Sequence, residues 1–338
     1  MISRNELSEI FSNKDPVALE YLAARAGRIT AAQFGKVISL YAPIYLSNYC
    51  ENDCVYCGFR ASGGIQRKKL TLDQIETEMK IVSGSGIRNI LLLTGESRKM
   101  SPVSYLLDAV KIAGKYFSSI SLEVYPLETE EYRDLYMAGV DGVTVYQETY
   151  DRKRYKELHL FGKKRDYDYR YNTPYRIGAS GIRMISMGIL AGLSGLEDDL
   201  FSLFEHLDIM ERKYPGIEYS VSFPRLIIEP DDETDYREVT DMDLAKCIIL
   251  TRLNFPRIGI NLSTREEASF RDHALYFGVT RISAASNTSV GGYDEGASDD
   301  PQFRINDIRS LKEIESVLRS KGFDPVFTDW RRIENTPV

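Results

Sequence analysis

Three cysteines within eight residues constrain this chain more than any other feature. Cys50, Cys54 and Cys57 have the spacing C-x3-C-x2-C and follow an apolar segment, 42–46, that is predicted to be a strand. A structural zinc site is normally closed by four ligands. Iron–sulfur clusters are held by cysteine thiolates, and three thiolates on a four-iron cluster leave one iron for a ligand that is not protein. The spacing therefore favours an iron–sulfur site, with a zinc knuckle or an incidental group of thiols as the alternatives.

Length and charge exclude several classes of protein. The chain has 338 residues, which suits either two domains or one large α/β barrel. Its 43 Lys and Arg against 50 Asp and Glu give a net charge of −7, so we expect no nucleic-acid partner. No apolar run approaches the about 20 residues of a membrane span, and the N-terminus lacks the apolar core of a secretory signal. We therefore expect a cytoplasmic protein with no membrane partner, in which Cys247 is a buried, unpaired thiol.

The pattern of apolar residues predicts an α/β fold. Residues 1–40 show helical periodicity and are expected to form an N-terminal cap. Farther along, strands are expected at 42–50, 89–93, 120–124, 143–146, 184–190, 219–223, 258–262 and 281–285. Helices are expected from residue 71 and at 102–115, 128–138 and 307–321. This alternation matches a single TIM-type (βα)8 barrel over 41–322, with a tail, 323–338, packed on it. A partial six-strand barrel is the alternative, because the last two strands are the weakest.

Polar motifs follow the second and fourth expected strands. The pair Gly95-Glu96 offers a flexible backbone that a ligand can approach and a carboxylate that can accept from an ammonium group. Glu148 follows the fourth expected strand, where a desolvated acid is expected to bind something. Arg170 could bind a carboxylate bidentately. The competing explanations are a helix start at Gly95-Glu96 and a surface ion pair of Arg170 with Asp166.

Two arginines near the last three strands could bind a carboxylate group of a ligand. Arg265 follows the seventh strand and is the first choice, with the Ser283 hydroxyl nearby as a further polar group. Arg225, after the sixth strand, is the second choice. Structural pairing with Glu266 or Glu218 is the competing explanation for both arginines.

The cysteine motif, with Tyr56 before its last cysteine, resembles the signature of radical S-adenosylmethionine (SAM) enzymes. The runs 46–60 and 145–150 are similar to the 2-iminoacetate synthase family (tyrosine lyase, ThiH) and to its relative HydG, and the likeness extends over about 20–332. Ser97 stands where many members have histidine, so no role is carried over to it. The resemblance implies a [4Fe–4S] cluster on Cys50, Cys54 and Cys57, and SAM held by Tyr56, Gly95, Glu96, Glu148 and Arg170. It also implies that Arg265, Ser283 and Arg225 position the substrate.

The same resemblance implies an activity. It is the cleavage of the Cα–Cβ bond of L-tyrosine to 2-iminoacetate and p-cresol for thiamine thiazole biosynthesis, while SAM yields methionine and 5′-deoxyadenosine. The implied partners are the thiazole synthase ThiG and an electron donor such as flavodoxin or ferredoxin. HydG carries a second cysteine cluster near its C-terminus, whereas no cysteine follows Cys247 here, which favours the thiamine role. A lyase acting on tryptophan and a non-catalytic metal-binding protein are the alternatives.

Overall fold

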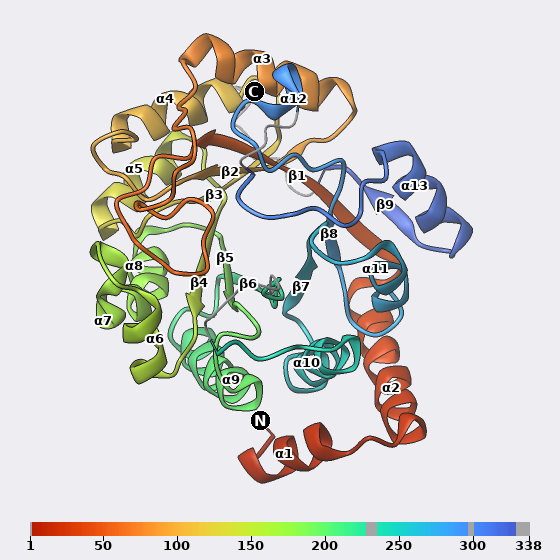
Figure 1. Ribbon diagram of the computed structural model, residues 1–338. Coiled ribbons are helices and arrows are strands. Elements are labelled where there is room, and N and C mark those ends of the chain that lie inside the picture. The colour runs from red at the N-terminus through yellow and green to blue at the C-terminus, as the bar shows by residue number, and fades with distance from the viewer. Residues whose placement is uncertain (1, 228–234, 297–300, 329–338) are drawn as a thin grey trace.

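Eight parallel strands close into a barrel in the computed structural model, which describes residues 2–227, 235–296 and 301–328 (Figure 1). The strand order is β2-β3-β4-β5-β6-β7-β8-β1, and β1 also pairs with β2 to complete the ring. The strands are β1 Val37–Ser47, β2 Asn89–Thr94, β3 Ser119–Glu123, β4 Gly142–Glu148, β5 Met184–Ile189, β6 Glu218–Ser222, β7 Gly259–Leu262 and β8 Arg281–Ser283. The predicted (βα)8 barrel is confirmed, and the six-strand alternative is wrong.

Alternation along each strand separates the helix-facing core from the barrel interior. In β2, Ile90 and Leu92 are fully buried, whereas Leu91 and Leu93 line the interior cavity. Successive side chains of a strand point to opposite faces, so one short apolar run serves both layers. Side chains from every strand of the barrel therefore line the interior cavity.

A ring of helices surrounds the barrel (Figure 1). These helices are α3 Leu72–Gly84, α4 Val103–Ala113, α5 Thr129–Ala138, α6 Arg152–Leu158, α7 Tyr167–Tyr171, α8 Thr173–Ser180, α9 Leu196–Lys213, α10 Asp241–Asn254, α11 Ala268–Ala274, α12 Gly292–Glu295 and α13 Leu311–Ser320, with a 3-10 turn, η1, at Lys163–Arg165. Several begin at a capping box, in which a side-chain oxygen and the residue three positions on satisfy free backbone amides. Thr71 does this for α3 and Ser310 for α13. No helix of the described part of the chain is long and apolar enough to cross a membrane.

The N-terminal helices end earlier than predicted. α1 Arg4–Ser12 and α2 Pro16–Phe34 form, but Gly35 ends α2 with φ 64°, a conformation that favours glycine. β1 then begins at Val37, so the prediction that residues 1–40 are helical is wrong for 35–40. That segment can be a strand because it finds partners that lie far away in sequence, in β8 and in β9 Asp324–Val326.

β9 pairs in parallel with the start of β1 and was not predicted. It comes from the segment expected to be a C-terminal tail, of which residues 329–338 lie outside the described chain. The division of the chain into cap, barrel and tail stays a prediction.

Candidate active site

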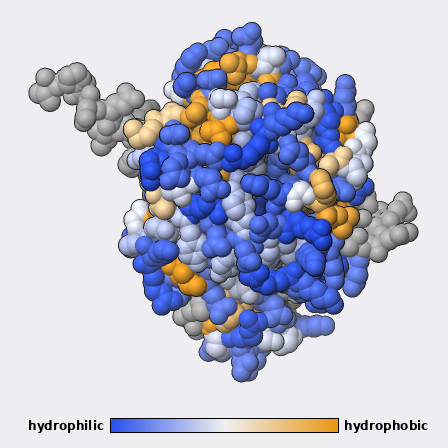
Figure 2. Space-filling model, turned by 90° about the vertical axis from the view of Figure 1, so that its left-hand side faces the viewer, coloured by the Kyte–Doolittle hydropathy of each residue, from blue (hydrophilic) through white to orange (hydrophobic). Residues whose placement is uncertain are grey.

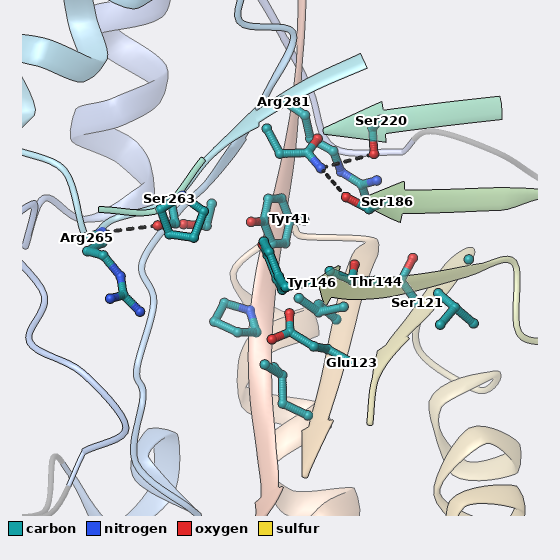
Figure 3. A pocket seen from close by; sticks show the side chains of 18 of the residues that line it. Tyr41, Ser121, Glu123, Thr144, Tyr146, Ser186, Ser220, Ser263, Arg265 and Arg281 are labelled. Atoms are coloured by element: carbon teal, nitrogen blue, oxygen red, sulfur yellow. Dashed lines mark hydrogen bonds between the residues drawn. The ribbon is translucent and has the colours of Figure 1, made fainter. Parts of the chain in front are cut away.

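A cavity of about 650 Å³ occupies the interior of the barrel and contains nearly all the residues singled out by sequence. All three clustered cysteines line it, as do Glu96, Glu148 and Arg170. Its volume is in the range of small-molecule sites. In the close view of its inner part, Arg265 lies on one side, Ser121 and Thr144 lie on the other, and Tyr41 and Tyr146 lie between them (Figure 3).

The cysteine loop leaves β1 at the carboxyl end of the barrel. Cys50, Cys54 and Cys57 are all free thiols, and the Cys57 amide donates to the Cys54 carbonyl at 3.1 Å, which tightens the turn. Burial raises the pKa of all three thiols. Thiolates at these positions would need a nearby positive charge, as bound iron supplies. Within the described ranges, no three His, Cys, Asp or Glu side chains are close enough to hold a single metal ion. Three thiols around one cavity do fit a cluster of several irons with one open position.

Tyr56 is held inside the loop by a histidine that sequence analysis left unassigned. The Tyr56 hydroxyl is 2.7 Å from Nε2 of His159, and Nδ1 of His159 is 2.6 Å from the Tyr155 carbonyl oxygen. A carbonyl can only accept, so Nδ1 carries the proton and Nε2 accepts from the Tyr56 hydroxyl. Burial and the Lys164 charge lower the pKa of His159 to about 3, so its ring is neutral. Tyr56 therefore has a fixed orientation beside the cysteines.

Four buried charges meet next to the cysteine loop. Arg170 Nη1 is 2.6 Å from Glu96 Oε1, and its Nη2 is 3.7 Å from Glu148 Oε1. Lys164 Nζ is 2.7 Å from Glu148 and 3.9 Å from Glu96. Asn52 also donates to Glu96, at 2.8 Å. Two carboxylates thus face two cations in a compact, neutral group. A ligand carrying one ammonium and one carboxylate, as the methionine moiety of SAM does, matches such a group charge for charge.

This group of charges rules out one explanation considered for Arg170 and adds Lys164 to the site residues. The surface pairing of Arg170 with Asp166 is wrong, because Arg170 is buried and Asp166 instead caps α7 by accepting from the Tyr169 amide. Lys164 was missed because it lies in the run Lys163-Lys164-Arg165, which looks like a solvated surface in sequence. Burial opposes the charge of Lys164, but the neighbouring carboxylates, Glu148 first, raise its pKa well above the usual value.

Backbone geometry at the strand ends also serves the site. Glu148 has φ 71° at a register shift between β4 and β5, a costly conformation for a residue with a side chain. Gly95 was expected to let a ligand approach. In the structure, a Cβ atom at position 95 would instead meet the Tyr49 carbonyl oxygen. The glycine lets the turn after β2 lie against the cysteine loop, where the Glu51 amide donates to the Glu96 carbonyl at 3.0 Å.

Two of the three residues predicted to position a substrate line the cavity. Arg265 and Ser283 line it, but Arg225 does not. The Arg225 guanidinium binds Glu266, with Nε at 2.7 Å, and also Asp241, with Nη1 at 2.7 Å. Structural ion pairing therefore explains Arg225, because its guanidinium contacts the carboxylates of Glu266 and Asp241.

Arg265 is different. Its Nη1 donates to the Arg225 carbonyl at 3.1 Å, and its guanidinium lies 3.9 Å from the centre of the Phe303 ring. It has no carboxylate partner in the described ranges, and its buried Nε has no hydrogen bond there. Ser283 accepts a hydrogen bond from the Thr264 amide at 3.0 Å, which ties the ends of β7 and β8 together. Among the described residues, Arg265 is therefore a cation without a carboxylate partner.

Glu123 is a cavity residue that sequence analysis missed. It ends β3 and points into the barrel interior beside Tyr41 and Tyr146 (Figure 3). Burial and the Glu148 carboxylate raise its pKa to about 7. The only sequence signal for Glu123 was its position at the carboxyl end of a strand, where barrel enzymes place functional groups.

Comparisons with known proteins agree with this geometry. Residues 44–207 match the model of the radical SAM superfamily, and residues 222–324 match the biotin and thiamin synthesis associated domain. The 2-iminoacetate synthases of Salmonella typhimurium LT2 and Escherichia coli K12 are each 39% identical over 97% of this chain and 88% of theirs. The crystal structure of HydG, a maturase of the [FeFe]-hydrogenase, superposes with a TM-score of 0.91 at 32% identity, over 96% of this chain and 73% of that one.

A parallel (βα)8 barrel with three free cysteines at its mouth defines a radical SAM enzyme, which uses a [4Fe–4S] cluster and SAM. With 39% identity over nearly its whole length, the chain belongs to the 2-iminoacetate synthase family of radical SAM lyases. The predicted resemblance and the prediction of an enzyme are confirmed.

Proposed function

We propose that this enzyme cleaves the Cα–Cβ bond of L-tyrosine to 2-iminoacetate and p-cresol, in the formation of the thiamine thiazole. The observation that carries the proposal is Arg265, a cavity guanidinium with no carboxylate partner in the described ranges, in a chain 39% identical to 2-iminoacetate synthases. Such a group suits the carboxylate of an amino acid.

In this proposal the cofactors lie at the carboxyl end of the barrel. Cys50, Cys54 and Cys57 hold the cluster, and SAM is bound by the side chains of Tyr56, Glu96, Glu148 and Arg170, with Gly95 shaping the adjoining turn. When bound, the reduced cluster and SAM together supply a 5′-deoxyadenosyl radical able to abstract a hydrogen atom. Lys164 neutralises Glu148 and so keeps the group of four charges balanced.

Arg265 then orients the substrate. Its guanidinium binds the substrate carboxylate, which places the adjacent amine near the carboxyl end of the barrel. Ser283 supports this position of Arg265 by linking the ends of β7 and β8. Arg225 acts indirectly, since its backbone carbonyl accepts from Arg265 while its side chain is engaged by Glu266. Binding inside the barrel cavity would hold the reacting atoms away from bulk water.

The partners proposed from the resemblance are ThiG, which would take the labile 2-iminoacetate, and a flavodoxin or ferredoxin that supplies electrons. Four free cysteines suit a reducing compartment, which supports a cytoplasmic location.

The test is product analysis after anaerobic reconstitution of the cluster, with SAM, a reductant and tyrosine. We expect both 5′-deoxyadenosine and p-cresol, and neither from a Cys54→Ala variant. 5′-Deoxyadenosine without p-cresol would redirect the substrate assignment to tryptophan. Neither product from protein with an intact cluster would refute the proposal.

A further inference from the structure

One short segment has a charge opposite to that of the chain as a whole. Residues 152–165 contain seven Lys or Arg and one Glu, whereas the entire chain has a net charge of −7. The whole-chain balance hides this segment, which is why composition alone suggested no basic surface. The segment spans α6, the turn after it and η1.

The segment forms the outer wall of the cysteine loop. The Asp53 amide donates to the Phe161 carbonyl at 3.1 Å, and the Leu160 amide donates back to the Asp53 carbonyl at 3.0 Å. The backbone of Cys54 itself forms an isolated antiparallel β-bridge with that of His159. The backbone of 158–161 therefore lies directly against the loop whose thiols face the cavity.

The outer side of this wall is apolar and exposed at its centre. Leu160 is 51% exposed and Phe161 is 68% exposed. Figure 2 views the molecule from the side on which Figure 1 shows α6 and α7, and there the apolar residues form small separate patches on a mostly hydrophilic face. Leu160 and Phe161 are consecutive, large and apolar, and they lie beside the cysteine loop. An exposed apolar group surrounded by polar residues is a feature of contact surfaces.

The basic residues of the segment divide into two sets. Arg152 pairs with Asp168, Arg154 binds the carbonyls of 193 and 235, and Lys164 points into the cavity. The other four, Lys153, Lys156, Lys163 and Arg165, are exposed and have no carboxylate partner in the described ranges; we call them the basic rim. Arg165 Nη1 donates to the Leu160 carbonyl, which places this rim residue beside the apolar pair. An exposed cation without a countercharge is available to a partner.

We propose that segment 152–165 docks an acidic one-electron carrier protein, with Leu160 and Phe161 at the centre of the contact and the basic rim around them. The proposal rests on the proposed function only in requiring reduction of a cluster on Cys50, Cys54 and Cys57. One electron leaves the reduced centre of the carrier and one is gained by the cluster, with no bond made or broken.

The charges explain why a local surface is needed. An acidic carrier is repelled by a chain of net charge −7, so productive encounters require a patch of opposite sign. Electron-transfer contacts are small and short-lived, and charge steers them more than buried area does. Docking on 158–161 would bring the carrier to the backbone that contacts the cysteine loop at Asp53 and Cys54.

The test is the rate of cluster reduction, followed optically without tyrosine, in protein with a reconstituted cluster. The reductants are reduced flavodoxin and photoreduced deazaflavin, a small molecule that needs no docking surface. The variants are Lys153→Glu/Lys156→Glu and Phe161→Ser. The matched control is Lys14→Glu/Lys312→Glu, which makes the same charge change at two exposed lysines outside the segment.

We expect the Lys153→Glu/Lys156→Glu variant to be reduced by flavodoxin about tenfold more slowly than the wild type at low salt, with the difference shrinking as salt rises. Phe161→Ser should also be slower, without that salt dependence. Reduction by deazaflavin should be unchanged, and the control should match the wild type with both reductants.

Three results would overturn the proposal. They are an unchanged flavodoxin rate in the variants, an equal loss in the control, and a proportional loss with deazaflavin. The last would mean that the segment shapes the surroundings of the cluster. Because no product is measured, failure to form p-cresol would refute the substrate assignment and leave this test intact.

Discussion

Replacing Arg170 by methionine tests whether the four buried charges stabilise the fold as one neutral group. The change leaves Glu96 and Glu148 facing Lys164 alone, and their side chains are only 15% and 10% exposed. Removing one partner of a buried ion pair costs about 3–5 kcal/mol. Lys164 lies 2.7 Å from Glu148 but 3.9 Å from Glu96, so it offsets part of that loss. We expect the free energy of unfolding at pH 7 to fall by about 3 kcal/mol.

The assay is urea unfolding of cluster-free protein, followed by circular dichroism, for the wild type, Arg170→Met, Glu96→Gln and the double variant. The double variant restores the balance, since one cation then faces one carboxylate. We expect it to lose less than the sum of the two single losses, with a coupling of about 1–3 kcal/mol. The slope of the free energy against urea should be the same in all four proteins.

The pH dependence supplies an independent check. Burial opposes ionisation of Glu96, but the Arg170 and Lys164 charges outweigh it and lower the pKa. A lowered carboxyl pKa contributes stability above the unfolded value of about 4.5, and that stability is lost as pH falls through the folded value. The advantage of the wild type over Glu96→Gln should therefore shrink in acid. A loss below about 1 kcal/mol in Arg170→Met, or strictly additive losses, would refute the reasoning, because water would then be screening the charges.

Three further predictions concern the cavity. Cys54→Ala should bind little iron and sulfide after reconstitution, whereas Cys247→Ala, in the core on α10, should bind wild-type amounts; equal iron contents would contradict the cluster assignment. Arg265→Lys should weaken tyrosine binding, measured by calorimetry, by about tenfold, since an ammonium cannot bind a carboxylate through two parallel bonds. Its SAM affinity should be unchanged, and a parallel loss of both affinities would argue against a substrate role. Glu123→Gln should match the wild type in stability at pH 4 and exceed it by at most about 3 kcal/mol at pH 8, because a carboxyl pKa raised to about 7 makes ionisation destabilising as pH rises from about 4.5 to 7. A difference that does not change with pH would contradict this explanation.

Sequence reasoning located the barrel strands to within a few residues. It did so because a strand buried on both faces is a short apolar run, and such a run is visible without any knowledge of its neighbours. It failed at 35–40 and at β9, where the strand forms through pairing between segments far apart in sequence, as in Val37 with Asp324. Local periodicity carries no information about such partners.

The sequence by itself indicated the class of chemistry, because Cys50, Cys54, Cys57 and the motifs that resemble radical SAM enzymes are short local patterns that can be recognised without the fold. Only the tertiary structure decided which of the charged residues are paired. Arg225 and Arg265 look alike in sequence, yet Arg225 faces Glu266 while Arg265 has no carboxylate partner in the described ranges. The physical reason is that the role of a charge depends on which opposite charge lies within about 4 Å, and the fold sets that distance between residues far apart in the chain.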